Sequence, residues 1–445
     1  MEPHPIRMVV DDDLRRSRLT VFFRLLLAVP HFVWLVLWGI LVFLTAILSW
    51  FVVLLSGRLP QAFHRFQSAY VRYWTHLLAF LYLAANPFPG FVGRAGSYPV
   101  DLEIDAPVRQ SRLKTAFRIL LAQPALALAT LLAGHGMPLP GGGSWSEEGR
   151  LSAVDSAWIA TPVPSAGFVA LVVAILAWFV ALVLGRSPQG FRDLAAYGLR
   201  YGAQVAGYLL FLTDRYPSSD TAQPRAAQAP PMKPVRLTVE DDLRRSRLTV
   251  FFRLLLFLPH YVWLSLWGLA AALAVLASWF ATLARGRSPE ALHRFLAAYL
   301  RYQAHVYSYL FLVANPFPGF TGAAGTYPVD VEIDPPARQN RWITGFRLVL
   351  VVPAVVVAWV LTYVLYLVGV YLWVVGLLLG RSPEGLRNLG AFVVRYWAQT
   401  YAYLYLLTDS YPYSGPSEYL RPVAAFDPEG LPAWPGPLRP PSLSA

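Results

Sequence analysis

The stretch Arg18–Gly57 reads RLTVFFRLLLAVPHFVWLVLWGILVFLTAILSWFVVLLSG, and the fold of the whole chain follows from it. Its last 33 residues, from Leu25 to Gly57, contain no Asp, Glu, Lys or Arg. A helix of that length is about 50 Å long at ~1.5 Å per residue, whereas the hydrocarbon core of a bilayer is only about 30 Å thick. The pattern therefore predicts a membrane-embedded segment that tilts steeply, begins as an interfacial helix or folds back on itself.

The composition of the 445-residue chain indicates an integral membrane protein. Apolar residues make up 56% of it and charged residues only 14%, a balance unlike that of soluble domains. There is no cysteine, so disulfides and cysteine-ligated metals are excluded. The first apolar run is far longer than the hydrophobic region of a secretory signal, so we expect no cleavable signal peptide.

Internal similarity divides the chain into four repeats. A shift of 229 residues lays DDLRRSRLTVFFRLLL of Asp12–Leu27 on the same string at Asp241–Leu256, and a shift of 94 lays Arg287 on Arg381. The predicted divisions are repeat 1 at 6–97, repeat 2 at 98–217 with a polar insertion at 134–167, a linker at 218–234, repeat 3 at 235–326, repeat 4 at 327–412 and a Pro-rich tail at 413–445. Linker and tail are rich in Pro, Ala and Ser, and we expect both to be disordered.

Each repeat has the same predicted order of elements. The alternation at Val100–Asp105 and Val329–Asp334 predicts short strands; the four equivalent strands are able to pair into one small sheet on the membrane face. A long apolar block and a Gly-Arg turn follow, and in repeat 3 Ser288–Glu290 supplies a predicted N-cap, a first-turn Pro and an acidic residue. The helix so started, Pro60–Ala84 in repeat 1, is amphipathic and is predicted to lie at the membrane interface.

Two topologies are open for the apolar block. The insertion at 134–167 is polar and interrupts the block near its middle, and because a polar loop cannot sit in hydrocarbon, we favour a helical hairpin whose tip tolerates insertion. Every basic residue except Arg150 then falls on one face, which the positive-inside rule makes cytoplasmic. The alternative is that the block is a long bent helix whose second part is one span, with the Pro60–Ala84 helix as the return span. That topology places Arg72 and its equivalents inside the membrane at a cost of at least about 2.5 kcal/mol each.

Four arginines recur at equivalent places in every repeat, and they are the candidate contacts for lipid headgroups. Arg24, for example, lies inside an apolar run, where its guanidinium is within reach of a lipid phosphate or of a carboxylate such as Asp12. The competing interpretation is that these arginines anchor helices and satisfy helix ends. The full set is Arg18, Arg24, Arg58, Arg72, Arg112, Arg118, Arg186, Arg200, Arg247, Arg253, Arg287, Arg301, Arg341, Arg347, Arg381 and Arg395.

Other candidate sites are weaker. The spacing of His64 from His76 and of His293 from His305 is not a metal-ligand pattern, so we interpret them as interfacial polar residues. The acidic triplets at 11–13 and 240–242 run straight into Arg-Arg, which favours intramolecular ion pairs over a cation site.

The sequence contains no Gly-rich phosphate loop, metal-protease motif or nucleophile elbow, so we expect neither an enzyme nor a cofactor or metal. The arginines flank apolar segments instead of forming a soluble basic stripe, which argues against nucleic acid as a partner.

The last repeat carries a recognisable motif. Arg-Tyr at 395–396, Tyr-Ala-Tyr at 401–403, Leu-Leu-Thr-Asp at 406–409 and Tyr-Pro at 411–412, together with Gly-Arg-Ser-Pro-Glu-Gly at 380–385, resemble bacterial membrane proteins grouped as domain-of-unknown-function family 4389 (DUF4389). The resemblance covers Ile6–Pro412 in four copies. It departs in repeats 1 and 3, where Asn-Pro-Phe-Pro-Gly-Phe replaces Thr-Asp-x-Tyr-Pro. It implies a membrane location and transfers no catalytic residue.

The sequence thus predicts a mostly α-helical, integral membrane protein with about eight embedded helical segments, four amphipathic interface helices and four short strands. We expect a multi-pass protein of the inner (plasma) membrane with both termini in the cytoplasm. The predicted function is that of a non-enzymatic membrane scaffold or a protein that binds anionic membrane lipids. The alternative is a transporter or channel subunit whose four repeats enclose a path.

Overall fold

The computed structural model describes residues 4–133, 168–221, 225–226, 231 and 233–416. The polar insertion at 134–167, parts of the linker and the tail from 417 onward lie outside the described residues. The chain is mostly helical, as predicted, and the four repeats have the same order of elements.

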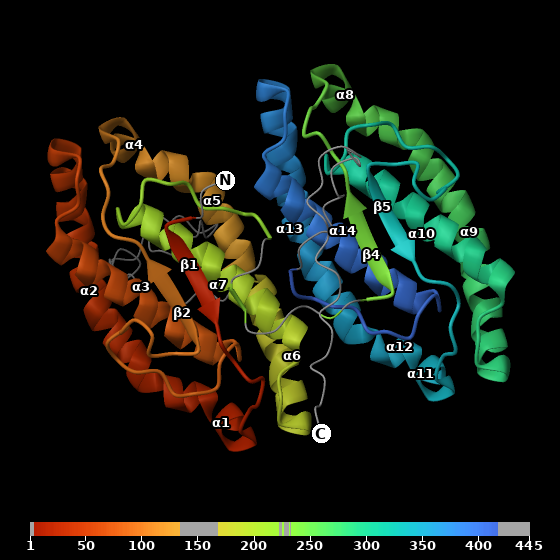
Figure 1. Ribbon diagram of the computed structural model, residues 1–445, viewed down its shortest axis with the longest axis horizontal. Coiled ribbons are helices and arrows are strands. Elements are labelled where there is room, and N and C mark those ends of the chain that lie inside the picture. The colour runs from red at the N-terminus through yellow and green to blue at the C-terminus, as the bar shows by residue number, and fades with distance from the viewer. Residues whose placement is uncertain (1–3, 134–167, 222–224, 227–230, 232, 417–445) are drawn as a thin grey trace, which may run out of the picture.

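Each repeat consists of a strand, a short helix, a long apolar helix and a central helix (Figure 1). Repeat 1 contains β1 (Ile6–Val10), α1 (Arg18–Phe22), α2 (Arg24–Ser56) and α3 (Gln61–Leu81). Repeat 2 contains β2 (Val100–Ile104), α4 (Arg112–Ala116), α5 (Arg118–Ala133), α6 (Phe168–Leu184) and α7 (Gln189–Leu209). The two-residue strand β3 (Arg225–Ala226) follows. Repeat 3 contains β4 (Val235–Val239), α8 (Arg247–Phe251), α9 (Arg253–Arg285) and α10 (Glu290–Leu310). Repeat 4 contains β5 (Val329–Ile333), α11 (Arg341–Gly345), α12 (Arg347–Leu350), α13 (Val352–Leu379) and α14 (Glu384–Leu404).

In repeats 1, 3 and 4 the apolar block is a long helix, so the predicted hairpin is wrong there; in repeat 2 the residues between α5 and α6 lie outside the described part of the chain. Helices α2 and α9 each run for 33 residues without a turn, and in repeat 4 α12 continues into α13 through Val351, whose backbone is helical. Gly39, near the expected hairpin tip, instead lets the α2 backbone approach the Tyr70 hydroxyl, which lies 3.4 Å from the position of an added Cβ. The helix ends at Gly57 with a φ of 71°, a left-handed conformation that glycine adopts at little cost.

The strands form two separate sheets and not one four-stranded sheet. Strand β1 pairs with β2 antiparallel, with Met8 opposite Leu102, and β4 pairs with β5, with Leu237 opposite Val331; β3 adds to β1 in parallel. In both pairs the two facing residues are 94 positions apart in the sequence, which equals the repeat shift. A pseudo-two-fold axis normal to the sheet therefore passes between Met8 and Leu102 and relates repeat 1 to repeat 2.

The amphipathic helices are central and not interfacial, which corrects the prediction. Helix α3 packs against α2, α7 and β2, and α10 packs against α9, α14 and β5; Figure 1 shows the strand pairs in front of these helices, with α2 and α9 at the two outer edges. Their polar side chains bind strand carbonyls: Arg72 Nε donates to Leu102 O (3.0 Å) and Gln204 Nε2 to Ile6 O (3.0 Å). The strands, and not water, cover the polar face.

The beginnings of the linker and the tail are packed, which corrects their prediction as disordered. Ser219 and Thr221 are buried in the linker, as are Tyr413 and Ser414 in the tail. The two halves also meet along the long helices, where α13 packs against α5 and α6. Residue Asp220 adds a bridge between halves, because its Oδ1 accepts a hydrogen bond from Asn388 Nδ2 (2.9 Å).

The long helices expose most of their apolar surface. Three helical stretches, Arg24–Ser56, Arg253–Arg285 and Arg347–Leu379, are long and apolar enough to cross a membrane. Only 17% of the most apolar part of the first is buried within the molecule. Soluble proteins rarely expose contiguous apolar surface of this extent, so this surface suggests a membrane protein.

Candidate functional site

Exposed arginines gather at the ends of the long helices, in four clusters that we call the arginine corners. Two paired repeats form each corner. One repeat contributes the Gly-Arg turn that follows its long helix, and the other contributes the segment that precedes its short helix. Their main members are Arg15, Arg18 and Arg186 in corner A; Arg58, Arg109 and Arg112 in corner B; Arg244, Arg247 and Arg381 in corner C; and Arg287, Arg338 and Arg341 in corner D.

Backbone hydrogen bonds hold each corner together. The left-handed glycine that ends a long helix leaves its carbonyl free, and a backbone N–H of the paired repeat donates to it: Gln110 N to Gly57 O (2.8 Å) and Gln339 N to Gly286 O (2.9 Å). At three corners this pairing places two arginines opposite each other in isolated antiparallel bridges, namely Arg15 with Arg186, Arg244 with Arg381 and Arg287 with Arg338. Each of these bridges therefore brings two exposed arginines to one corner.

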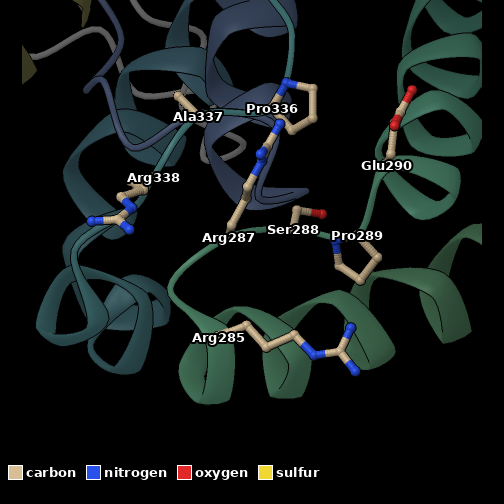
Figure 2. Close-up of a pocket in the computed structure, with 8 residues that line it drawn as sticks. All are labelled: Arg285, Arg287, Ser288, Pro289, Glu290, Pro336, Ala337 and Arg338. Atoms are coloured by element: carbon tan, nitrogen blue, oxygen red, sulfur yellow. The ribbon is translucent and has the colours of Figure 1, made fainter.

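Corner D opens onto a shallow pocket of about 630 Å³. In Figure 2, the Arg287 side chain extends toward Pro336, and Arg285 lies below Arg287. Arg338 and Glu290 lie on opposite sides of Arg287, and the Glu290 carboxylate points away from the arginines. Within the described chain, ion pairs of arginine are formed elsewhere, by Arg7, Arg16, Arg118, Arg192, Arg236 and Arg245. The pocket therefore offers guanidinium groups to an anion.

Four of the predicted site residues are buried anchors. Arg24, Arg118, Arg253 and Arg347 begin the helices after the short ones, and each donates hydrogen bonds to two carbonyls at the end of its own repeat's central helix. In repeat 3, Arg253 Nη1 binds Tyr309 O and Ala314 O (3.1 Å) and Nη2 binds Asn315 Oδ1 (3.0 Å). These guanidinium groups satisfy the carbonyls that a helix C-terminus leaves without partners.

A second set of four also binds backbone. Arg72 and Arg301 donate from Nε to the strand carbonyls of Leu102 and Val331, both at 3.0 Å. Arg200 and Arg395 donate to carbonyls of the linker and the tail, Asp220 O and Gly415 O. The other eight candidates are exposed at the corners, and the lipid interpretation keeps them for that reason: Arg18, Arg58, Arg112, Arg186, Arg247, Arg287, Arg341 and Arg381. Three of these also donate one hydrogen bond to a carbonyl near the end of a long helix, namely Arg18, Arg247 and Arg341.

The sequence interpretation missed a further series of corner arginines. Arg15, Arg109, Arg244 and Arg338 are exposed, and each stands beside the Gly-Arg turn of the paired repeat. The signal was present, because the 94- and 229-residue shifts that define the repeats also superimpose these four positions.

The histidines are buried, and their prediction as interfacial residues is wrong. His64 and His293 are buried in the core, while His76 and His305 bind carboxylates, with His76 Nε2 2.7 Å from Asp101 Oδ1 and His305 Nε2 2.9 Å from Asp330 Oδ1. Burial alone would raise the pKa of Asp101, but hydrogen bonds from His76 and from two backbone N–H groups outweigh it and lower that pKa. These pairs fasten a central helix to a strand.

The acidic triplets form ion pairs within the chain, as predicted. Arg16 binds Asp12 through two hydrogen bonds of 3.0 and 2.8 Å, and Arg245 binds Asp241 in the same way at 3.1 and 2.8 Å. In the described part of the chain, no group of three or more His, Cys, Asp or Glu side chains is arranged to hold a metal ion.

Comparison with known proteins identifies the family. No curated protein and no solved structure matches the chain. The family model described as Domain of unknown function (DUF4389) matches residues 18–92, 159–219, 247–321 and 341–414, once in each repeat and over more than half of the chain. Each match to repeats 1, 3 and 4 begins at the corner arginine that opens the short helix. The chain therefore belongs to the DUF4389 family and carries four tandem copies of its domain.

Proposed function

We propose that this protein is a non-enzymatic membrane protein that binds the phosphate groups of anionic lipids at its four arginine corners. The observation that carries the proposal is the pairing of arginines across the isolated bridges, such as Arg287 opposite Arg338. The exposed guanidinium groups of one corner offer positive charge to a phosphate, and the planar fork of arginine binds phosphate oxygens through two parallel hydrogen bonds.

The surroundings of the corners favour a lipid over a soluble phosphate. Beside Arg341 at corner D, Trp342 and Phe346 are 77% and 58% exposed. At corner A, Leu19 and Phe22 next to Arg18 are 70% and 61% exposed. A phospholipid has both chemistries, since its phosphate fits the arginines while its acyl chains cover the apolar side chains beside them.

The charge of the chain supports a location at an anionic membrane surface. The formal net charge is +12, and basic residues near such a surface contribute about 1 kcal/mol each to its attraction. We place the corners at the cytoplasmic leaflet of the inner (plasma) membrane, with both termini in the cytoplasm, because basic segments prefer that side. A scaffold role fits several lipid sites on one chain.

The transport alternative draws no support from the contact between the central helices of repeats 3 and 4. The cavity between α10 and α14 measures about 10 Å³, and its lining includes Leu300, Tyr307, Val394 and Trp397. A cavity needs roughly 10–15 Å³ to hold a single water. A transport path needs a larger polar space.

Lipid retention tests the proposal. In the triple variant Arg186→Gln/Arg287→Gln/Arg381→Gln, we expect the anionic phospholipid that co-purifies in mild detergent, measured by mass spectrometry, to bind about tenfold more weakly. The estimate follows from the ~1.5–3 kcal/mol of a hydrogen bond to a charged group. Added inorganic phosphate distinguishes a lipid site from a general phosphate site, because it should displace the bound lipid only from a general phosphate site.

The control removes the same charge away from the corners. Arg7→Gln/Arg94→Gln/Arg236→Gln changes three exposed or half-exposed arginines that lie on the outer faces of the sheets and on a loop. We expect this variant to retain the lipid of the unmodified protein. Equal lipid retention by the two triple variants would refute the proposal.

A further inference from the structure

We propose that the long helices lie in the plane of the membrane, embedded in one leaflet, and that none of them crosses it. The inference rests on the proposed membrane role but not on lipid binding by the arginines. It replaces the multi-pass topology predicted from the sequence, and the symmetry of the strands carries it.

The first step is the position of the corners relative to the sheet. The axis between Met8 and Leu102 is normal to the sheet, and it exchanges repeat 1 with repeat 2. It therefore exchanges corner A with corner B. The strand pair β1–β2 must then lie midway between these two corners, and the same holds for β4–β5 between corners C and D because Leu237 faces Val331.

The second step is the direction of the long helices. At corner A, Arg18 at the start of repeat 1 donates to Val183 O at the end of α6 (2.9 Å). At corner B, the segment before α4 binds Gly57 at the end of α2. The long helices of the two repeats therefore run antiparallel between the same two corners, and the sheet lies beside the middle of that distance.

A crossing orientation contradicts this arrangement. It would put corners A and B on opposite sides of the membrane and the strand pair at half depth, facing lipid. The outer face of that pair carries Arg7, Glu103 and Asp105, whose side chains are 37%, 51% and 47% exposed. Each charge at the bilayer centre costs about 2.5–3.5 kcal/mol on insertion scales, and open sheet edges do not occur in hydrocarbon.

The in-plane orientation removes both of these costs. Figure 1 looks onto the faces of both strand pairs along the shortest axis of the molecule, and the long helices run across that view. If this axis is the membrane normal, all four corners lie at one depth and the charged sheet faces meet water. A helix is about 10 Å across, which fits within one leaflet, half of the ~30 Å hydrocarbon core.

The exposed apolar side chains follow the same geometry. On α2, Leu26, Leu37, Leu44 and Phe51 fall on one face, opposite the stripe that packs on α3, and they are 67%, 54%, 51% and 52% exposed. The equivalent residues of α9 are Leu255, Leu266, Leu273 and Phe280, at 61%, 55%, 71% and 60%. The occupant of this surface is the acyl region of one leaflet.

Cysteine accessibility tests the orientation in a chain that has no native cysteine. Ser17→Cys places an exposed thiol at corner A, just before α1, and Ser56→Cys places one at the end of α2 next to corner B. Glu103→Cys places one on the outer face of the sheet. Each variant is treated with a membrane-impermeant maleimide in sealed right-side-out and in sealed inverted vesicles. We expect all three sites to react in the same kind of vesicle and none in the other. Reaction of Ser17→Cys and Ser56→Cys in opposite kinds of vesicle would overturn the inference.

Leu44→Cys is the matched control in the middle of α2. It should react only after the vesicles are dissolved in detergent, and its reaction in intact vesicles would refute the membrane role itself. The arginine proposal is separated by repeating the labelling in the Arg186→Gln/Arg287→Gln/Arg381→Gln background. If labelling in that background is again one-sided, the in-plane orientation holds, whether lipid retention is unchanged or lost. The lipid experiment then decides the arginine proposal by itself.

Discussion

At the scale of single residues, the buried arginines offset a strained turn. Two residues after the end of each central helix stands a non-glycine residue with positive φ: Leu83 at 55°, Phe211 at 61°, Leu312 at 59° and Leu406 at 60°. Such a conformation costs on the order of 1–3 kcal/mol. In every repeat an arginine donates to carbonyls on both sides of this residue. The guanidinium group therefore closes the negative end of the helix around the strained residue.

Replacing one of these anchors should destabilise the protein strongly. We expect Arg253→Gln to lower the free energy of unfolding by about 2–4 kcal/mol, because hydrogen bonds to a charged group are lost and buried carbonyls are left without a donor. Glutamine keeps a good helix propensity. Arg287→Gln, at an exposed corner, should change it by less than about 0.5 kcal/mol. Denaturant unfolding in detergent micelles measures both, and equal effects would contradict the assignment of Arg253 as an anchor.

The two arginine roles explain how much of the candidate site was predictable. The repeat shift identifies equivalent arginines such as Arg24 and Arg58, but it carries no information on burial. Arg24 binds Phe80 O and Ala85 O, groups that come close only when the central helix folds back along the long one. Half of the predicted set is therefore bound within the fold, and the other half is exposed at the corners.

At the scale of elements, the segment after each central helix distinguishes outer from inner repeats. In repeat 1, Phe88 and Phe91 pack on His31 with ring centroids 4.6 and 4.3 Å away, and Trp34 Nε1 donates to Phe91 O (2.8 Å). The segment thus covers the groove between α2 and α3 at the edge of the molecule. In repeats 2 and 4 the corresponding segments run toward the other half, which gives a physical reason for the two different motifs.

The segment that follows the central helix of repeat 1 should tolerate alanine at one of its glycines and not at another. Gly93 has a φ of 59°, and an added Cβ would lie 2.0 Å from Ala69 O. We expect Gly93→Ala to cost more than about 2 kcal/mol of stability, since both the conformation and the contact are unfavourable. Gly90 has no atom within 4 Å of an added Cβ, so Gly90→Ala should cost less than about 0.5 kcal/mol.

Thermal unfolding of the two variants side by side is the measurement. Gly322→Ala in repeat 3 is a second copy of the test, because its Cβ would lie 2.1 Å from Ala298 O. If Gly93→Ala and Gly90→Ala melted together, the close packing of this segment on the central helix would be wrong.

Periodicity explains which elements the sequence predicted correctly. Alternation located the strand at Val100–Ile104 and amphipathicity located the central helix at Gln61–Leu81, since both patterns are local. A polar helix face does not say what covers it, and here strand carbonyls do. The predicted N-cap at Ser288 fails for a similar reason: Pro289 occupies the N-cap position, and the Ser288 hydroxyl lies 3.2 Å from that of Ser278.

At the scale of the whole molecule, each half sends a segment across to the other. The linker after repeat 2 reaches α14, where Asp220 accepts from Asn388, and the tail after repeat 4 reaches α7, where the Tyr413 hydroxyl donates to Asp193. Asp193 is in turn paired with the buried Arg192 at 2.7 Å. The exchange is reciprocal, so it ties the two halves into one body independently of the long-helix contact.

A disulfide should trap this exchange. An added Cβ at Gly190 would lie 2.7 Å from the Ser414 hydroxyl oxygen, and bridged cysteines have Cβ atoms about 3.5–4.5 Å apart. In a Gly190→Cys/Ser414→Cys variant with a protease site inserted at 227–230, we expect the cleaved halves to migrate together on a non-reducing gel and to separate after reduction. The cleaved halves of the Gly190→Cys single variant must separate on the gel both with and without reductant. The reciprocal pair, Ser219→Cys/Gly385→Cys, should behave like the first, because the Gly385 Cβ would lie 2.9 Å from Ser219 Oγ. Separation of the double variants without reductant would show that each segment packs on its own half.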